Sequence, residues 1–135
     1  MKRFLIMFYL CLGLPLVSVA EDDVTVNIQQ VITEQLTAFL NEDAPAAWEH
    51  AHPSIKEKFG SADIFLLMVK QAYTPMMSFT QLEFLSLTAL DDSWLQKVRL
   101  MDRRGDRYEL NYILIESKPE IFEIAGVTIE ANNGI

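Results

Sequence analysis

The chain has 135 residues, of which 50% are hydrophobic, and its 11 basic residues stand against 19 acidic ones, for a net charge of −8. This length is enough for one hydrophobic core and too short for two. The excess of negative charge argues against binding to nucleic acids or anionic lipids, because proteins bind both mainly through lysine and arginine.

The first twenty residues have the pattern of a cleavable signal peptide. Lys2 and Arg3 precede an apolar run over residues 4–12, and the small residues Ser18 and Ala20 stand two apart before an acidic segment. Signal peptidase reads this order of charge, apolar run and small residues, so we expect cleavage after Ala20 and a periplasmic or secreted protein. The run is shorter than the roughly 20 residues that span a bilayer, so no membrane span is expected after cleavage.

The single cysteine, Cys11, falls inside this leader. Residues 21–135 are therefore expected to form a single α+β domain without disulfides or thiol chemistry. Loss of Lys2 and Arg3 with the leader would make this domain more acidic than the precursor.

The first half of this domain predicts helices. Apolar residues recur every three or four positions over residues 24–40, which is the pattern of an amphipathic helix. A second short helix is expected after Asp43, which suits an N-cap, followed by a helical turn over residues 54–59 that ends at Gly60. Ser61 is expected to cap a further helix.

After residue 77 the hydrophobic periodicity changes to two, which predicts strands. Shifts in this alternation near Phe84 and at Gly126 predict bulges that bend the sheet. Short turns predict an antiparallel sheet of four strands, over residues 79–90, 94–101, 107–116 and 121–130. Helices followed by such strands predict an α+β fold, with N-terminal helices packed on a curved four-stranded antiparallel sheet.

The second expected strand contains an unusual polar residue. Lys97 and Arg99 must reach water, so alternation places Trp94, Gln96 and Val98 on the inner face. A buried amide needs hydrogen-bond partners. Two alternatives are open for Gln96: a tyrosine or backbone partner inside a closed core, or a place at the mouth of a pocket.

Motifs spread over nearly all of residues 21–135 resemble a known family. They include Ile32-x-x-Gln35-Leu36, Ala51-His52-Pro53-x-Ile55, Phe65-x-x-Met68-Val69, Gln96-x-Val98-x-Leu100-x-Asp102-x-x-Gly105 and Tyr112-x-Leu114. Their order and spacing are similar to the bacterial domain-of-unknown-function family 4864. The sequence departs from that family at His52, where a small hydroxyl residue is usual, and at Phe122-Glu123-Ile124, where tryptophan and a basic residue are usual.

The family in turn resembles the nuclear transport factor 2-like and cystatin-like folds. This resemblance implies a cone-shaped α+β fold, in which a curved sheet wraps around the first helix and leaves a pocket at its open end. It implies no reaction, because that superfold hosts both enzymes and non-catalytic binding domains.

Groups that could carry catalysis or bind a metal are few. His50 and His52 are the only histidines, and residues two apart point to different sides of a helix, so no metal site is expected. Glu83 and Glu109 are the strand carboxylates available to an isomerase, but alternation places Glu109 on the outer face. Arg104-Gly105-Asp106 suits a hairpin turn, and the sequence has no serine nucleophile elbow or phosphate-binding glycine loop. No catalytic residue and no cofactor are therefore expected.

The sequence favours binding over catalysis. A small apolar ligand or an envelope protein partner would use the open end of the sheet, or the outer face that Ile113 and Ile115 make partly apolar. The alternative is a small periplasmic enzyme, a proton-transfer isomerase or hydrolase, in the same pocket, and a homodimer is also left open. The residues expected to line the pocket, which equally suit a plain core, are Trp48, Tyr73, Trp94, Gln96, Tyr112 and Phe122.

The leader gives the first testable prediction. Protein recovered from the periplasm of an expressing bacterium should begin at Glu21, because signal peptidase cleaves after the second small residue of Ser18-x-Ala20. N-terminal sequencing checks this. The variant Ala20→Lys should accumulate as the uncleaved precursor. A wild-type protein that is recovered from the periplasm and still begins at Met1 would show that residues 1–20 are not a cleavable signal peptide.

Overall fold

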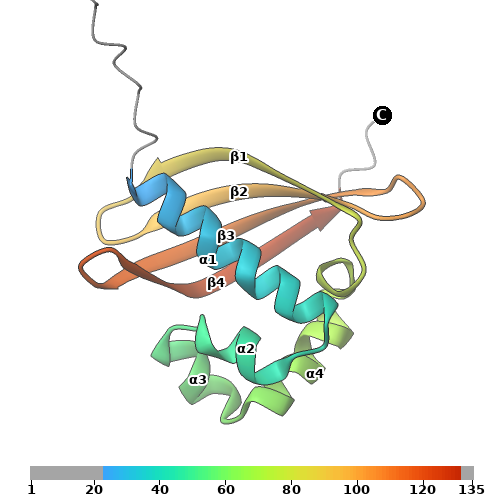
Figure 1. Ribbon diagram of the computed structural model, residues 1–135, viewed down its shortest axis with the longest axis horizontal. Coiled ribbons are helices and arrows are strands. Elements are labelled where there is room, and N and C mark those ends of the chain that lie inside the picture. The colour runs from blue at the N-terminus through green and yellow to red at the C-terminus, as the bar shows by residue number, and fades with distance from the viewer. Residues whose placement is uncertain (1–22, 132–135) are drawn as a thin grey trace, which may run out of the picture.

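A computed structural model describes residues 23–131, so the expected leader lies outside the described residues. The described chain is an α+β fold whose helices precede an open, four-stranded antiparallel sheet (Figure 1). The helical half contains α1 (Asp23–Leu40), α2 (Ala44–Glu49), α3 (Pro53–Phe59), α4 (Ala62–Ala72) and the 3-10 helix η1 (Thr74–Met77). The strands lie in the sheet in chain order: β1 (Gln81–Ala89), β2 (Trp94–Met101), β3 (Arg107–Lys118) and β4 (Ile121–Ala131).

The helix ends follow the local signals in the sequence. Asp43 caps α2 and Ser61 caps α4, each through a side-chain oxygen that accepts a hydrogen bond from an amide of the first turn. Gly60 follows α3 with φ of 79°, a left-handed conformation that glycine adopts without strain. One cap was not expected: Nδ1 of His52 accepts a hydrogen bond from the Ser54 amide and so starts α3.

The helices cover the sheet unevenly. In Figure 1, α1 crosses one face of the sheet obliquely, while α2, α3 and α4 gather beyond its β4 edge. Both α1 and α3 pack against β4. No helix of the described part of the chain is both long and apolar enough to cross a membrane.

The core lies between α1 and the inner face of the sheet. Helical spacing places Ile28, Ile32, Leu36 and Phe39 on one face of α1, and all four are fully buried. The strands contribute fully buried residues at alternate positions: Gln96, Val98, Leu100, Leu110, Tyr112 and Leu114. The inward orientation predicted for Gln96 is therefore confirmed.

Two bulges interrupt the sheet where the sequence predicts them. The register of β1 against β2 shifts just after Phe84. In β4, Ile124 and Gly126 pair with consecutive residues of β3, so Ala125 between them is the extra residue. A bulge of this kind bends its strand and leaves one residue outside the regular ladder.

The packing of α1 can be tested with two leucines of the same helix. Leu36 is fully buried, whereas Leu40, four residues later, is 42% exposed. We expect Leu36→Ala to lower the free energy of unfolding by about 2 to 5 kcal/mol because it removes buried methyl groups and leaves a cavity. The matched control Leu40→Ala should cost only about 0.5 kcal/mol in urea denaturation. Equal losses for the two variants would mean that α1 buries a different face.

Candidate functional site: a cavity beside the edge of β4

The short helices α2–α4 are attached to the edge of β4 at two points. At the first, the Ile124 amide donates to the His50 carbonyl at 2.8 Å, and the His52 amide donates to the Ile124 carbonyl at 2.9 Å. At the second, the Tyr73 hydroxyl donates to the Val127 carbonyl at 3.0 Å. The bulge of β4 lies between these attachments.

A cavity of about 570 Å³ opens beside this bulge. Ala125 and Gly126 line it from the sheet side, and α3, α4 and the C-terminal part of α1 line the remaining sides. Its size falls in the range of about 300 to 1,000 Å³ typical of small-molecule sites. Most lining side chains are apolar: Phe39, Ile55, Phe59, Phe65, Met68, Val69, Met76 and Ile124.

Aromatic packing supports the wall of the cavity. The ring of Phe65 lies 5.8 Å from those of Phe39 and Phe59, measured between centroids, and the three rings come from three different helices. The ring of Phe65 also lies 5.6 Å from that of Trp48. These tilted arrangements are favourable for aromatic pairs, so the wall is held by side-chain packing.

Four polar side chains also line the cavity, and three of them donate to protein acceptors. Gln35 is buried, and its Nε2 donates to the Ala47 carbonyl at 3.2 Å. Tyr73 donates to β4, as described above. The Ser54 hydroxyl lies 2.9 Å from Nδ1 of His52, which already accepts the Ser54 amide, so the hydroxyl is the donor of this pair.

The fourth polar side chain is Lys58. It is exposed at the side of the cavity, and its Nζ lies 5.4 Å from the centroid of the Phe59 ring. Lys58 carries the one charge among the cavity-lining residues of the described chain. Neither a carboxylate nor an imidazole lines the cavity, so the titratable side chains among its lining residues are Lys58 and Tyr73.

Tyr73 is the one residue of the expected pocket set that lines this cavity. Trp48 packs behind the wall against Phe65, and Trp94 is half-buried at the start of β2. Tyr112 and Phe122 are buried in the core. These aromatic residues therefore lie outside the cavity lining.

Gln96 also lies away from the cavity lining, in a closed part of the core. Its Nε2 lies 3.3 Å from the carbonyl oxygens of Leu85 and Ser86 in the β1 bulge, and 2.8 Å from that of Lys97. The structure thus agrees with the backbone-partner alternative. Tyr112 faces Gln96 across the β2–β3 ladder, and burial raises the pKa of its hydroxyl. Among the described residues, neither this hydroxyl nor Oε1 of Gln96 has a hydrogen-bond partner.

The remaining candidate groups are engaged elsewhere. Nε2 of His50 lies 3.2 Å from a carboxylate oxygen of Glu34 on α1. Within residues 23–131, no group of three or more histidine, cysteine or acidic side chains could hold a metal ion. Glu83 and Glu109 flank the Arg99 guanidinium at 3.4 and 3.2 Å, so both carboxylates form ion pairs with this side chain on the outer face of the sheet.

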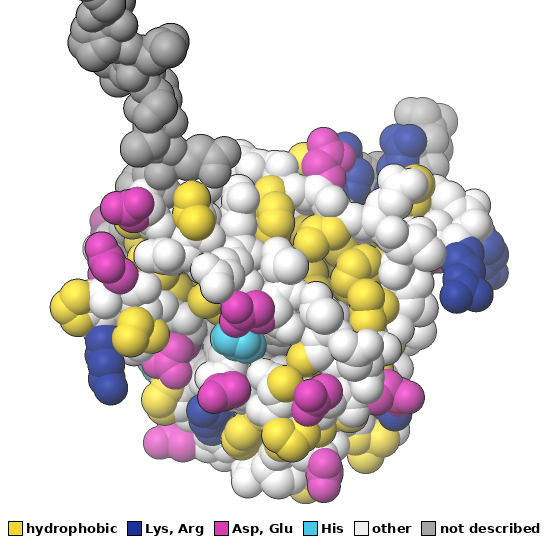
Figure 2. Space-filling model, viewed as in Figure 1, with side chains coloured by type: hydrophobic (Ala, Val, Ile, Leu, Met, Phe, Trp, Pro, Cys, Tyr) yellow, Lys and Arg dark blue, Asp and Glu magenta, His cyan; other side chains and the backbone are white. Residues whose placement is uncertain are grey.

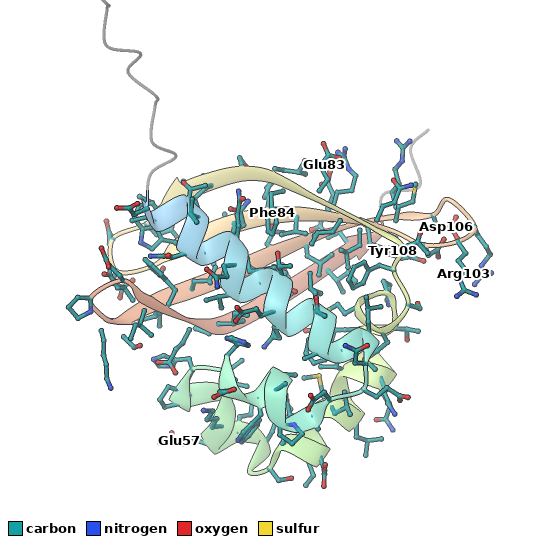
Figure 3. All side chains as sticks on the ribbon, in the orientation of Figure 1. Glu57, Glu83, Phe84, Arg103, Asp106 and Tyr108 are labelled. Carbon is teal, nitrogen blue, oxygen red and sulfur yellow. The ribbon has the colours of Figure 1, made fainter. Side chains whose placement is uncertain are left out.

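The Arg104-Gly105-Asp106 tripeptide lies in the β2–β3 hairpin, whose Arg103 and Asp106 Figure 3 labels at one end of the sheet. Gly105 has φ of 82°, and Asp102 accepts hydrogen bonds from the Arg104 and Asp106 amides. The turn geometry therefore accounts for Gly105 and for Asp102, as expected of a hairpin turn.

Sequence reasoning missed the contribution of α3. Ser54, Ile55, Lys58 and Phe59 line the cavity at spacings of one, three and four residues, which place them on one helical face. That spacing is present in the sequence, but nothing in the sequence shows which element this face meets.

The family model described as Domain of unknown function (DUF4864) matches residues 21–135. The chain belongs to this family. No curated protein and no solved structure matches it significantly. The candidate site of this member of the family therefore has to be argued from its own residues.

The role of Gln96 can be tested by mutation. Gln96→Leu should lower the free energy of unfolding by about 1 to 3 kcal/mol, because it removes the buried amide that donates to the partly buried carbonyls of the β1 bulge. Gln81→Leu, on the exposed part of β1, is the control and should change stability by less than about 0.5 kcal/mol. A Gln96→Leu protein as stable as the wild type would mean that these hydrogen bonds do not stabilise the fold.

Proposed function

We propose that this protein is an exported, non-catalytic binding domain that holds a small apolar ligand in the cavity beside the β4 edge. The observation that carries the proposal is the cavity itself, which has about 570 Å³ of space and a mainly aromatic and aliphatic lining. Burial of apolar ligand surface in such a site is favourable by roughly 25 cal/mol per Å². The few polar groups at its edge would orient the ligand.

Export is supported by two features of the sequence. The N-terminal residues have the order of charge, apolar run and small residues that signal peptidase reads. The family match begins at residue 21, directly after the expected cleavage site. We therefore propose that the binding domain works in the periplasm or outside the cell.

We further propose that the fold is of the nuclear transport factor 2-like, cone-shaped type. The order of helices followed by four antiparallel strands, with α1 packed along the inner face of the sheet, supports this assignment. In such a cone the ligand would enter beside the helical half, where the bulge bends β4.

A hydrolase is the second candidate function, and one contact favours it. The Ser54 hydroxyl lines the cavity and lies 2.9 Å from a ring nitrogen of His52, as a nucleophile and its base would. The same nitrogen is also engaged as the cap of α3. The ion pairs among the described residues include His50 but not His52, so no carboxylate orients this imidazole. The binding function is therefore better supported.

The cavity can be blocked from its rim. Ala72 lines the cavity and is exposed, so Ala72→Trp should fill part of the cavity without disturbing the core. The control Gln71→Trp places the same ring on the preceding residue, which is exposed and does not line the cavity. We expect the neutral fluorescent probe 1-aminoanthracene to bind the wild type and the Gln71→Trp control with similar affinity. Ala72→Trp should weaken binding at least tenfold, about 1.4 kcal/mol.

Two results would decide against this proposal. One is a probe affinity that Ala72→Trp leaves unchanged, since the probe would then bind elsewhere. The other is hydrolysis of p-nitrophenyl butyrate by the wild type that Ser54→Ala abolishes, because that result would make the protein the hydrolase described above.

A further inference from the structure

We infer that the cavity selects ligands that carry an anionic head group on an apolar chain, such as a long-chain carboxylate or an alkyl phosphate, and that Lys58 supplies the counter-charge. This inference rests on the proposed function and adds the chemical class of the ligand. It follows from the position of Lys58, from the engagement of the other polar groups and from the absence of acidic side chains in the cavity lining.

The position of Lys58 is fixed by the face that α3 turns toward the cavity. Ser54 and Lys58 are four residues apart, as are Ile55 and Phe59, and all four line the cavity. The two polar side chains thus lie beside two apolar ones on the same helical face. An amphipathic ligand would meet both kinds of contact there.

The neighbours of Lys58 on α3 point elsewhere. Nζ of Lys56 lies 5.9 Å from the ring centroid of Trp48, behind the cavity wall. Glu57 is exposed and does not line the cavity, and Figure 3 shows it at the periphery of the helical half, away from the sheet. The nearest acidic residue in the sequence is therefore not a lining group of this site.

Lys58, like most cations of the described chain, forms no ion pair with a carboxylate there, so its charge is available to a ligand. Lys70 pairs with Glu42, and Arg99 lies between Glu83 and Glu109. Within residues 23–131, Lys58 has no carboxylate within 4.0 Å and contacts the Phe59 ring instead. An ammonium group beside an apolar surface without a counter-ion gains more from an anion than a fully solvated one does.

The donor groups around the cavity favour an anion over a neutral polar head. Tyr73, Ser54 and Gln35 each donate to a protein acceptor, as described above. Lys58 is the polar lining side chain that donates to no protein acceptor among the described residues. A carboxylate or phosphate would accept from it with charge assistance, whereas an alcohol would gain only a weaker hydrogen bond.

The cavity lining differs in charge from the protein as a whole. The net charge is −8, and Figure 2 shows acidic side chains spread over α1 and the helical half. A cavity lined by one cation and no acid thus offers an anion a local counter-charge on a protein whose net charge is negative. The apolar lining would hold the chain of the ligand, and Lys58 would hold its head at the rim.

The inference is tested by displacement of 1-aminoanthracene with ligands of equal chain length and different heads. Dodecanoate and dodecyl phosphate should displace the probe from the wild type about five- to tenfold more effectively than dodecanol at low salt. Dodecyltrimethylammonium should be weaker than dodecanol. The ratio of dodecanoate to dodecyl phosphate shows which of the two anionic heads fits better.

Variants on α3 assign the effect to one side chain. Lys58→Gln should bring the anionic ligands to the affinity of dodecanol, and Lys58→Arg should retain the preference. Lys56→Gln, two residues away on the same helix, is the matched control and should behave as the wild type. Because the Lys58 side chain is exposed, these variants should keep the stability of the wild type in urea denaturation.

The failures of this inference and of the proposed function are distinguishable. If the probe binds and is displaced equally by dodecanoate and dodecanol, or if Lys58→Gln keeps the preference for the anion, the inference is overturned while cavity binding stands. If neither the probe nor any of these ligands binds, the proposed function fails and the inference fails with it.

Discussion

The architecture depends on a single point of backbone pairing at the edge of the sheet. β4 is an edge strand, and an unpaired edge exposes hydrogen-bonding groups that other chains could use. At Ile124 the segment between α2 and α3 satisfies both the amide and the carbonyl, through His50 and His52. Together with the hydrogen bond from Tyr73 to Val127, this pairing attaches the short helices α2–α4 to the sheet, and it fixes where α3 begins. Because the bulge at Ala125 follows directly, the helices and the strand separate there instead of packing closely.

The separation explains why a cavity coexists with a well-packed core. The face of α1 that meets the sheet is filled by aliphatic residues, with Ile28, Ile32 and Leu36 fully buried. Beyond it, the Tyr73 hydroxyl closes the gap at Val127 but leaves space beside Ala125 and Gly126. Aromatic rings around Phe65 hold the opposite wall. The cavity is thus a consequence of how two layers join at their edge.

The sequence predicts the elements well because their signals are local. Asp43, Gly60 and Ser61 act within one turn of the helix that they start or end, and the bulges appear as breaks in a two-residue alternation. Alternation also predicts that Gln96 points inward. It does not predict whether the surrounding space is filled. The amide of Gln96 donates hydrogen bonds to carbonyls of the β1 bulge and does not line the cavity, so its inward orientation alone does not locate a pocket.

The cavity could not be predicted because it forms between segments that are distant in the sequence. The meeting of Ile124 with His50 and His52 depends on the whole fold, and no local pattern specifies it. Aromatic residues were the natural candidates for a pocket, yet Trp48 supports the wall from behind and Tyr112 lies in the core. The spacing of residues in the sequence indicates which of them share the face of α3 that carries Lys58. It does not indicate that this face meets the edge of the sheet and lines a cavity.

Amide chemical shifts of the ¹⁵N-labelled domain during a titration with dodecanoate would test the central claim most directly. The account predicts that the largest changes fall on Ser54, Lys58, Tyr73 and Val127, which surround the cavity, and that Lys97 and Glu109 on the outer face of the sheet stay unchanged. Saturable changes centred on the outer face, with the residues around the bulge of β4 unaffected, would contradict it.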